Sequence, residues 1–309
     1  MSGALWAVLA GVGFGLFQAA NRRASRGMDV YLSTFLQLAV AAVVLAGVAV
    51  ATEDLSLLRT ARPQAFLNFA LAAFVHFFLG WTFLNASQKR IGAARTSPLT
   101  STVPLFGVVI AALVLREFPG PVALAGIALV VTGVYFVSVE NDVTPETDRS
   151  DMAPGRPAEP AAQVAGWRGA VFGLGTAICW AISPVFIRGG LAGLPSPLLG
   201  LTVGMVICVL VYGVVVLARR GAPGTHMSTE ATLFKLIAGS LVGLSTWARW
   251  VALDLAPVGV VLAVALVSVP VTILLSPVAV GRHLERVTPR LWAGASVIIG
   301  GSLLLVWYR

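Results

Sequence analysis

The sequence predicts an all-α membrane protein with ten transmembrane helices, arranged as two inverted five-helix repeats. Of its 309 residues, 58% are hydrophobic and only 11% are charged, whereas a soluble domain carries about 25% charged residues. So much apolar surface must face lipid. Apolar stretches of about 20 residues, the length that crosses a bilayer, recur along the chain. One acidic, proline-rich stretch divides them five and five.

Ten stretches have the length and composition of a span, and the short gaps between most of them predict antiparallel neighbours. The first has no basic residues before it, so we interpret it as a retained span rather than a cleaved signal peptide. In chain order the spans are Ala4–Asn21, Val30–Ala51, Ala65–Ala86, Ser97–Leu115, Pro121–Val139, Gly169–Ile187, Leu198–Ala218, Phe234–Leu253, Val258–Val280 and Leu291–Tyr308.

The third span contains His76, the only histidine inside a predicted span. An ionisable group at this depth is a candidate functional residue, and a histidine there suits proton coupling. A structural histidine whose ring nitrogens are satisfied by neighbouring helices is the alternative.

The fourth span is unusually rich in hydroxyl groups beside proline, and the ninth repeats the pattern more weakly. Ser97, Thr100, Ser101 and Pro104 recur at helical spacing, and Ser268 and Pro270 correspond to them in the second half. A proline in a membrane helix frees a carbonyl that hydroxyls, water or a ligand can satisfy. We expect the two helices to line a polar cavity near the midplane. Alternatively, the hydroxyls bond their own backbone and help helices pack.

Residues 140–166 separate the two sets of spans. They contain six acidic residues, two arginines and four prolines, a composition that cannot bury a core and is typical of a solvated linker. The predicted organisation is a first repeat over residues 1–139, a flexible linker over 140–166 and a second repeat over 167–309.

The sixth and eighth spans hold the remaining polar candidates. Ser183 lies in the sixth span, next to Pro184. Arg249 lies near the end of the eighth, between Trp247 and Trp250, with Asp254 as a candidate partner. Arg249 either neutralises an anionic substrate or extends to the lipid headgroups between interfacial tryptophans.

The two halves share residues in the same order. Phe14 and Arg22 align with Trp180 and Arg188. Each half also has a glutamate followed nine residues later by a glycine, at Glu117 and Gly126 and at Glu285 and Gly294. Glycines spaced by four, such as Gly11 and Gly15, predict close helix crossings.

An odd number of spans inserts the second repeat upside down, and the loop charges support this. Lys and Arg prefer cytoplasmic loops, and the set of loops that carries more of them changes between the halves. In the first half these are the loops after the first and third spans, which include Arg22 and Arg23. In the second half they are the loops after the seventh and ninth spans, which include Arg219 and Arg220. Lys235, the second residue of the eighth span, is counted with the charges on the same side as the latter loop. The charges place both termini outside and the linker in the cytoplasm.

Two five-helix halves, a proline in the fourth helix and the "RE…G" and "LE…G" joints into the fifth resemble the EamA family of the drug/metabolite transporter superfamily. The resemblance implies a metabolite carrier that works by alternating access around a central cavity, with cytoplasmic termini. The resemblance and the loop charges therefore predict opposite orientations of the termini. Glu117 with Gly126 and Glu285 with Gly294 match the family's joint, where they start and pack a helix.

Small multidrug relatives in that superfamily use a membrane-embedded glutamate in the first helix. This sequence has no acid there, and Gln18 and Asn21 are the nearest polar residues. Proton-driven cation antiport by that mechanism is not expected.

We therefore expect a multi-pass protein of the cell (inner) membrane that carries a small metabolite, such as an amino acid or related compound, without ATP. The alternatives are a nucleotide-sugar or lipid-linked carrier, or a membrane-embedded enzyme. An enzyme is disfavoured because the sequence has no HExxH or GxSxG motif. The expected partners are lipid and a small substrate, with no nucleic acid, metal or cofactor.

Overall fold

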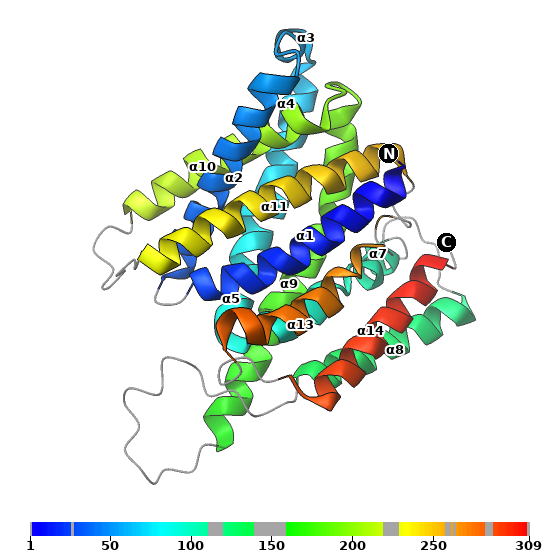
Figure 1. Ribbon diagram of the computed structural model, residues 1–309. Coiled ribbons are helices and arrows are strands. Elements are labelled where there is room, and N and C mark those ends of the chain that lie inside the picture. Colours follow the sequence, from blue (N-terminus) through cyan, green and yellow to red (C-terminus); the bar gives the residue numbers. More distant parts are fainter. Residues whose placement is uncertain are drawn as a thin grey trace.

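The described part of the computed structural model is helical, with no strand among its residues (Figure 1). It comprises residues 2–25, 28–110, 120–138, 159–218, 229–256, 261, 264–281 and 287–307. The helices are α1 (Gly3–Ala24), α2 (Val30–Thr52), α3 (Leu57–Thr60), α4 (Pro63–Ala73), the π-helix η1 (Phe74–Trp81), α5 (Thr82–Ile91), α6 (Ala93–Thr100), α7 (Val103–Ile110), α8 (Pro121–Ser138), α9 (Glu159–Leu191), α10 (Pro197–Ala218), α11 (Thr229–Leu255), α13 (Ser268–Val280) and α14 (Pro289–Trp307).

Within the described residues, six helical stretches are long and apolar enough to cross a membrane. They are Gly3–Ala24, Val30–Thr52, Pro63–Ile91, Trp167–Leu191, Pro197–Ala218 and Thr229–Leu255. Leu124–Val137 and Ser268–Val280 are apolar but shorter. The prediction of a multi-pass helical membrane protein is confirmed, and the count of ten spans stays a prediction.

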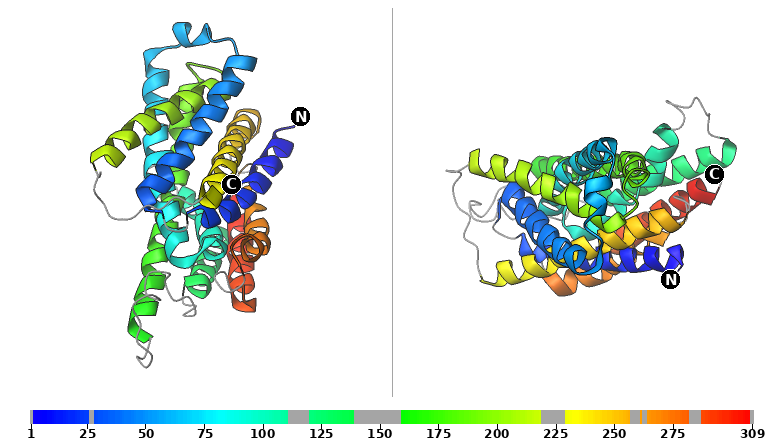
Figure 2. Two further views of the ribbon diagram at one scale, coloured as in Figure 1. Left: turned by 60° about the vertical axis from the view of Figure 1, so that its left-hand side comes forward. Right: turned by 90° about the horizontal axis from the view of Figure 1, so that it is seen from above.

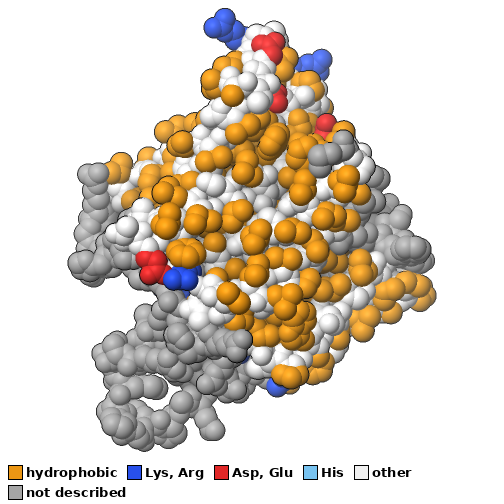
Figure 3. Space-filling model, in the orientation of Figure 1, with side chains coloured by type: hydrophobic (Ala, Val, Ile, Leu, Met, Phe, Trp, Pro, Cys, Tyr) orange, Lys and Arg blue, Asp and Glu red, His pale blue; other side chains and the backbone are white. Residues whose placement is uncertain are grey.

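The outer surface is as apolar as a lipid-facing surface must be. Figure 3 shows one face covered by hydrophobic side chains, with charged side chains near its margins. The side chains of Val43, Val185 and Val278 are 73%, 70% and 77% exposed. Such exposure is costly in water but not in hydrocarbon, where each helix satisfies its own backbone groups.

The helices of the first half pack mainly against helices of the second half. Helix α1 lies against α11 and α13, α2 lies against α10 and α11, and α9 lies against α4, α5 and α6. Figures 1 and 2 show α8 and α14 side by side at one edge of the molecule. These contacts keep the same pattern when the halves are exchanged: α1 with α11 corresponds to α9 with α4 and α5, and α1 with α13 corresponds to α9 with α6.

Glycines make the crossings close, as their spacing predicted. A Cβ added at Gly15 of α1 would lie 2.5 Å from Val271 Cγ1 and 3.0 Å from the Ser268 carbonyl oxygen of α13. One added at Gly200 of α10 would lie 2.4 Å from the Phe69 ring of α4. The same holds for Gly11, Gly169, Gly173, Gly204, Gly239 and Gly243, each of which has a neighbouring helix within 3.2 Å of the added atom.

Of the four predicted joint residues, the two glycines lie within the described part of the structure. Gly126 and Gly294 lie in the crossing of α8 and α14, where a Cβ at Gly301 would approach the Gly126 carbonyl oxygen to 2.7 Å. A Cβ at Gly294 would approach the Gly133 carbonyl oxygen to 3.1 Å. Both glycines therefore lie where α8 and α14 approach each other closely. Glu117 and Glu285 lie outside the described residues.

Two element boundaries differ from the prediction. Helix α9 begins at Glu159, inside the stretch assigned to the linker. An acidic residue followed by proline is a favourable helix start, and the alanines that follow are strong helix formers. The third predicted span continues to Ile91, because the polar residues at its end are buried inside the protein rather than exposed to solvent.

Candidate functional site

Two helices break where prolines and hydroxyl groups meet. Helix α6 ends at Thr100 and α7 begins at Val103, because Pro104 has no N–H for the Thr100 carbonyl one turn back. In the second half α13 begins at Ser268. There Pro270 has no N–H for the Leu266 carbonyl, which accepts a bond from the Val269 N–H at 3.1 Å instead. Irregular backbone at membrane depth is tolerated where it lines a cavity.

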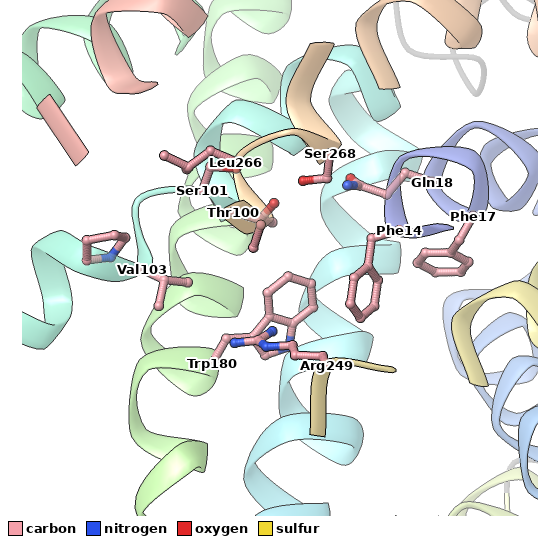
Figure 4. A pocket seen from close by; sticks show the side chains of 12 residues that line it. Phe14, Phe17, Gln18, Thr100, Ser101, Val103, Trp180, Arg249, Leu266 and Ser268 are labelled. Carbon is pink, nitrogen blue, oxygen red and sulfur yellow. The ribbon is translucent and has the colours of Figure 1, made fainter. Parts of the chain in front are cut away.

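A cavity lies between these two breaks, with walls from both halves of the chain (Figure 4). Its volume of about 50 Å³ is room for a few water molecules. About 530 Å³ of space at the site is free of protein atoms when the open region is included. The lining residues are Phe14, Phe17, Gln18, Thr100, Ser101, Val103, Pro104, Trp180, Arg249, Ala265, Leu266 and Ser268.

Most of the predicted cavity residues meet here. Gln18, Thr100, Ser101, Pro104, Arg249 and Ser268 line the cavity. Ser97, Ser183 and His76 are buried next to its walls. Pro270 is half-buried and is not among the lining residues.

The hydroxyl groups of the first half both face the cavity and bond their own helix. Thr100 Oγ1 and Ser101 Oγ donate to the Ser97 carbonyl oxygen at 2.9 and 3.0 Å. Their oxygen lone pairs are left for a ligand. Ser268 Oγ has no hydrogen-bond partner within the described residues, so its proton is available as well.

Arg249 and two aromatic rings form the opposite wall. The centroids of the Phe14 and Trp180 rings, the pair aligned between the repeats, are 6.3 Å apart. Arg249 Cζ lies 5.9 Å from the Trp180 ring, and the arginine is only 6% exposed. It therefore does not extend to headgroups. The predicted pairing with Asp254 is wrong: Asp254 is exposed, and residues five apart point in directions about 140° apart around a helix.

His76 lies behind the aromatic wall. Its ring stacks on Trp180, with centroids 5.4 Å apart and planes at 16°, and its Nδ1 shares a hydrogen bond of 2.8 Å with Ser183 Oγ. The residue belongs to η1, and π-helical turns are frequent at functional sites. His76 thus contacts a cavity residue without lining the cavity.

The sequence prediction missed a buried polar network centred on Lys235. Lys235 was counted with the loop charges, but it lies in α11 and is only 2% exposed. Its Nζ donates to Asn21 Oδ1 at 2.7 Å, Ser33 Oγ at 2.8 Å and Ser25 Oγ at 3.4 Å. All three protons of the ammonium group therefore meet neutral oxygens. Asn21 belongs to α1, Ser25 follows the end of α1 and Ser33 belongs to α2, so these hydrogen bonds join α11 to both helices.

The network continues to the cavity wall. Asn21 Nδ2 donates to Asn85 Oδ1 at 2.7 Å and to Gln88 Oε1 at 2.8 Å. Gln88 Nε2 lies 3.5 Å from Gln18 Oε1, and Gln18 Nε2 donates to Ser97 Oγ at 3.2 Å. The available signal was the spacing of three between Gln18 and Asn21 and between Asn85 and Gln88, which puts each pair on one helix face.

This architecture, with an apolar exterior and a polar cavity inside, defines a multi-pass helical membrane protein. The model of the EamA-like transporter family matches residues 1–139, and that family is part of the drug/metabolite transporter superfamily. The resemblance stated from the sequence is confirmed, and it indicates a membrane transporter of this type.

Comparison with solved structures supports the fold. A protein known from a crystal structure shares 18% sequence identity with this chain at a TM-score of 0.62, and the similarity covers 96% of this chain and 95% of that one. At this identity the similarity concerns the fold alone. No curated protein matches the sequence.

Proposed function

We propose that the protein is a secondary transporter that moves a small metabolite, such as an amino acid or related compound, by alternating access in the cell's inner membrane. The observation that carries the proposal is the cavity between the broken helices α6/α7 and α13. Each half contributes one interrupted proline helix to its walls, and the aligned aromatic residues Phe14 and Trp180 both line the cavity.

An inverted duplication gives such a cavity a reason to exist. Carriers built from two oppositely inserted repeats place the substrate site at the repeat interface and switch access by rocking one unit against the other. The exchange of packing partners between the halves, together with the reversal of loop charge, supports ten spans arranged in this way.

The Lys235 network supports a closed state at one end of the cavity. Its hydrogen bonds join α1, α2, α5 and α11 between Gln18 and the helix ends that carry Arg23 and Glu230, which form an ion pair of 2.6 Å. Access from that end requires these helices to separate. Polar contacts suit this task, because water can replace each of them when the end opens.

The proposal is tested by metabolite profiling and by transport into liposomes. We expect a strain that lacks the protein and a strain that overproduces it to differ in opposite directions in one class of small metabolite. A difference confined to nucleotide sugars or lipid-linked precursors would select the alternative carriers. No difference in either strain would contradict transport.

The same assay tests the cavity. Ser101→Leu places an apolar side chain in the cavity, and we expect it to abolish uptake by the purified protein in liposomes without preventing insertion. Thr132→Leu is the matched control, since Thr132 is exposed on α8 and its hydroxyl bonds only the Ala128 carbonyl oxygen, at 2.8 Å. Full uptake by Ser101→Leu would remove this helix break from the transport path.

A further inference from the structure

We infer that the cavity takes a small organic anion, with its negatively charged group held by Arg249 and its apolar part against Trp180 and Phe14. This inference rests on the proposed function and names the substrate class of the same site. Three features support it: an unneutralised cation, a lining without acidic groups, and the arrangement of aromatic and hydroxyl walls.

Arg249 carries a buried positive charge without a counter-charge from the described residues. The side chain is 6% exposed and lines the cavity, and no carboxylate forms an ion pair with it in the described part of the chain. Burying an isolated charge is costly unless it is paired. A guanidinium group presents a planar set of N–H donors that matches a carboxylate or another oxyanion, so a ligand that brings this charge completes the site.

The described lining contains no acidic residue. In the neighbouring α2, Asp29 and Glu53 cap the two ends of the helix, away from its middle. An ammonium group in the cavity would therefore find no counter-charge and would be repelled by Arg249 at short range. This disfavours cations, and within the proposed class of amino acids and related compounds it favours acids that lack the amino group.

The walls define how the anion lies. Figure 4 shows Arg249 beside the Trp180 ring, with Phe14 next to them and with Ser268, Thr100 and Ser101 across the cavity. An apolar part can pack against the two rings, which contact each other with centroids 6.3 Å apart, and a hydroxyl or carbonyl group at the other end can meet Ser268 Oγ. The volume of about 50 Å³ restricts the buried part to a few non-hydrogen atoms.

The test uses the full-length protein in liposomes and a cell extract of small molecules, separated by ion exchange into anionic, neutral, and cationic plus zwitterionic fractions. Each fraction is incubated with protein-containing and protein-free liposomes, and the trapped compounds are identified by mass spectrometry. We expect protein-dependent uptake from the anionic fraction. Arg249→Gln should reduce this uptake about tenfold or more, and Arg249→Lys, which keeps the charge, should restore part of it.

Arg188→Gln is the matched control, because Arg188 is exposed near the end of α9. This variant should transport the anions as the unaltered protein does. All variants are first compared by size-exclusion chromatography, and Arg249→Lys keeps the test valid if Arg249→Gln fails to fold. Uptake from another fraction but not from the anionic one would overturn the inference and leave the transport function standing, as would unchanged anion uptake by Arg249→Gln. Uptake from no fraction would overturn both.

Discussion

The indole ring of Trp180 is contacted by two ionisable side chains, His76 from η1 and Arg249 from α11. His76 is held in turn by Ser183 from α9, the helix that carries Trp180. A histidine in this position fixes the ring plane that forms one wall of the cavity. It touches the cavity only through Trp180, so we assign it a positioning role in the proposed transport.

We expect His76→Leu to abolish uptake into liposomes, because leucine provides neither the stacked ring nor the bond to Ser183. Ser183→Ala keeps the stacked ring and removes only the bond, so it should lower the initial rate of uptake less. Both variants should shift the tryptophan emission of the purified protein relative to the unaltered chain. Full uptake by His76→Leu would show that the orientation of Trp180 does not limit transport.

Residues of the site were predictable where a local pattern identified them. The hydroxyls of the fourth span stand beside prolines on one face, and this pattern alone predicted Thr100, Ser101 and Pro104 as cavity residues. Lys235 was not predictable, because its partners Asn21, Ser25 and Ser33 lie more than 200 residues away in the chain. A lysine near the start of an apolar stretch is equally typical of a headgroup contact.

Lys235 joins α11 to α1 and α2 through buried hydrogen bonds. Lys235→Met keeps the length of the side chain but leaves the buried Asn21 Oδ1 without the donor it has in Lys235 Nζ. We expect the free energy of unfolding to fall by about 1–3 kcal/mol, measured by thermal denaturation in detergent. Lys89→Met is the control, since Lys89 is half-buried and makes a single bond, to the Met28 carbonyl oxygen at 2.9 Å. Equal stability of the two variants would mean that the network does not hold these helices together.

Helices α8 and α14 offer a test with adjacent glycines. A Cβ at Gly301 would meet the Gly126 carbonyl oxygen at 2.7 Å and Leu129 Cβ at 2.9 Å, whereas one at Gly300 has nothing within 4 Å. Gly301→Ala should therefore destabilise the protein by about 1–3 kcal/mol. Gly300→Ala should be neutral or should stabilise it by up to about 1 kcal/mol through helix propensity. Thermal denaturation of both variants decides, and equal midpoints would contradict the close crossing.

The molecule as a whole was the most predictable level, because apolar length is a strong signal for membrane helices. Hydropathy identified all six of the long spans, and the glycine spacing identified the close crossings. The break between α6 and α7 and the extension of α9 were not predicted as boundaries. Both depend on where the chain finds hydrogen-bond partners in three dimensions, which the composition of a window does not contain.

The orientation in the membrane can be measured with single cysteines at opposite ends of the molecule. Ser56 follows the C-terminal end of α2, and Thr229 begins α11, whose Lys235 bonds Ser33 near the N-terminal end of α2. Both are exposed, while the native Cys179 and Cys208 are buried. From the loop charges we expect a membrane-impermeant maleimide to label Ser56→Cys in intact cells but Thr229→Cys only after permeabilisation. The reverse pattern would place the termini in the cytoplasm, as in the family.

The π-helical turn η1 also sets the directions, around the helix axis, in which two groups of polar side chains of one long span point. It adds a residue to the segment Pro63–Ile91, and each residue of an α-helix turns the chain by about 100°. With this turn, His76 faces α9 while Asn85 and Gln88 face α1. Deleting one residue of η1 would restore a regular helix and rotate Asn85 and Gln88 by about 100° relative to the helix that precedes η1. The number of residues in η1 therefore matters as much as their side chains.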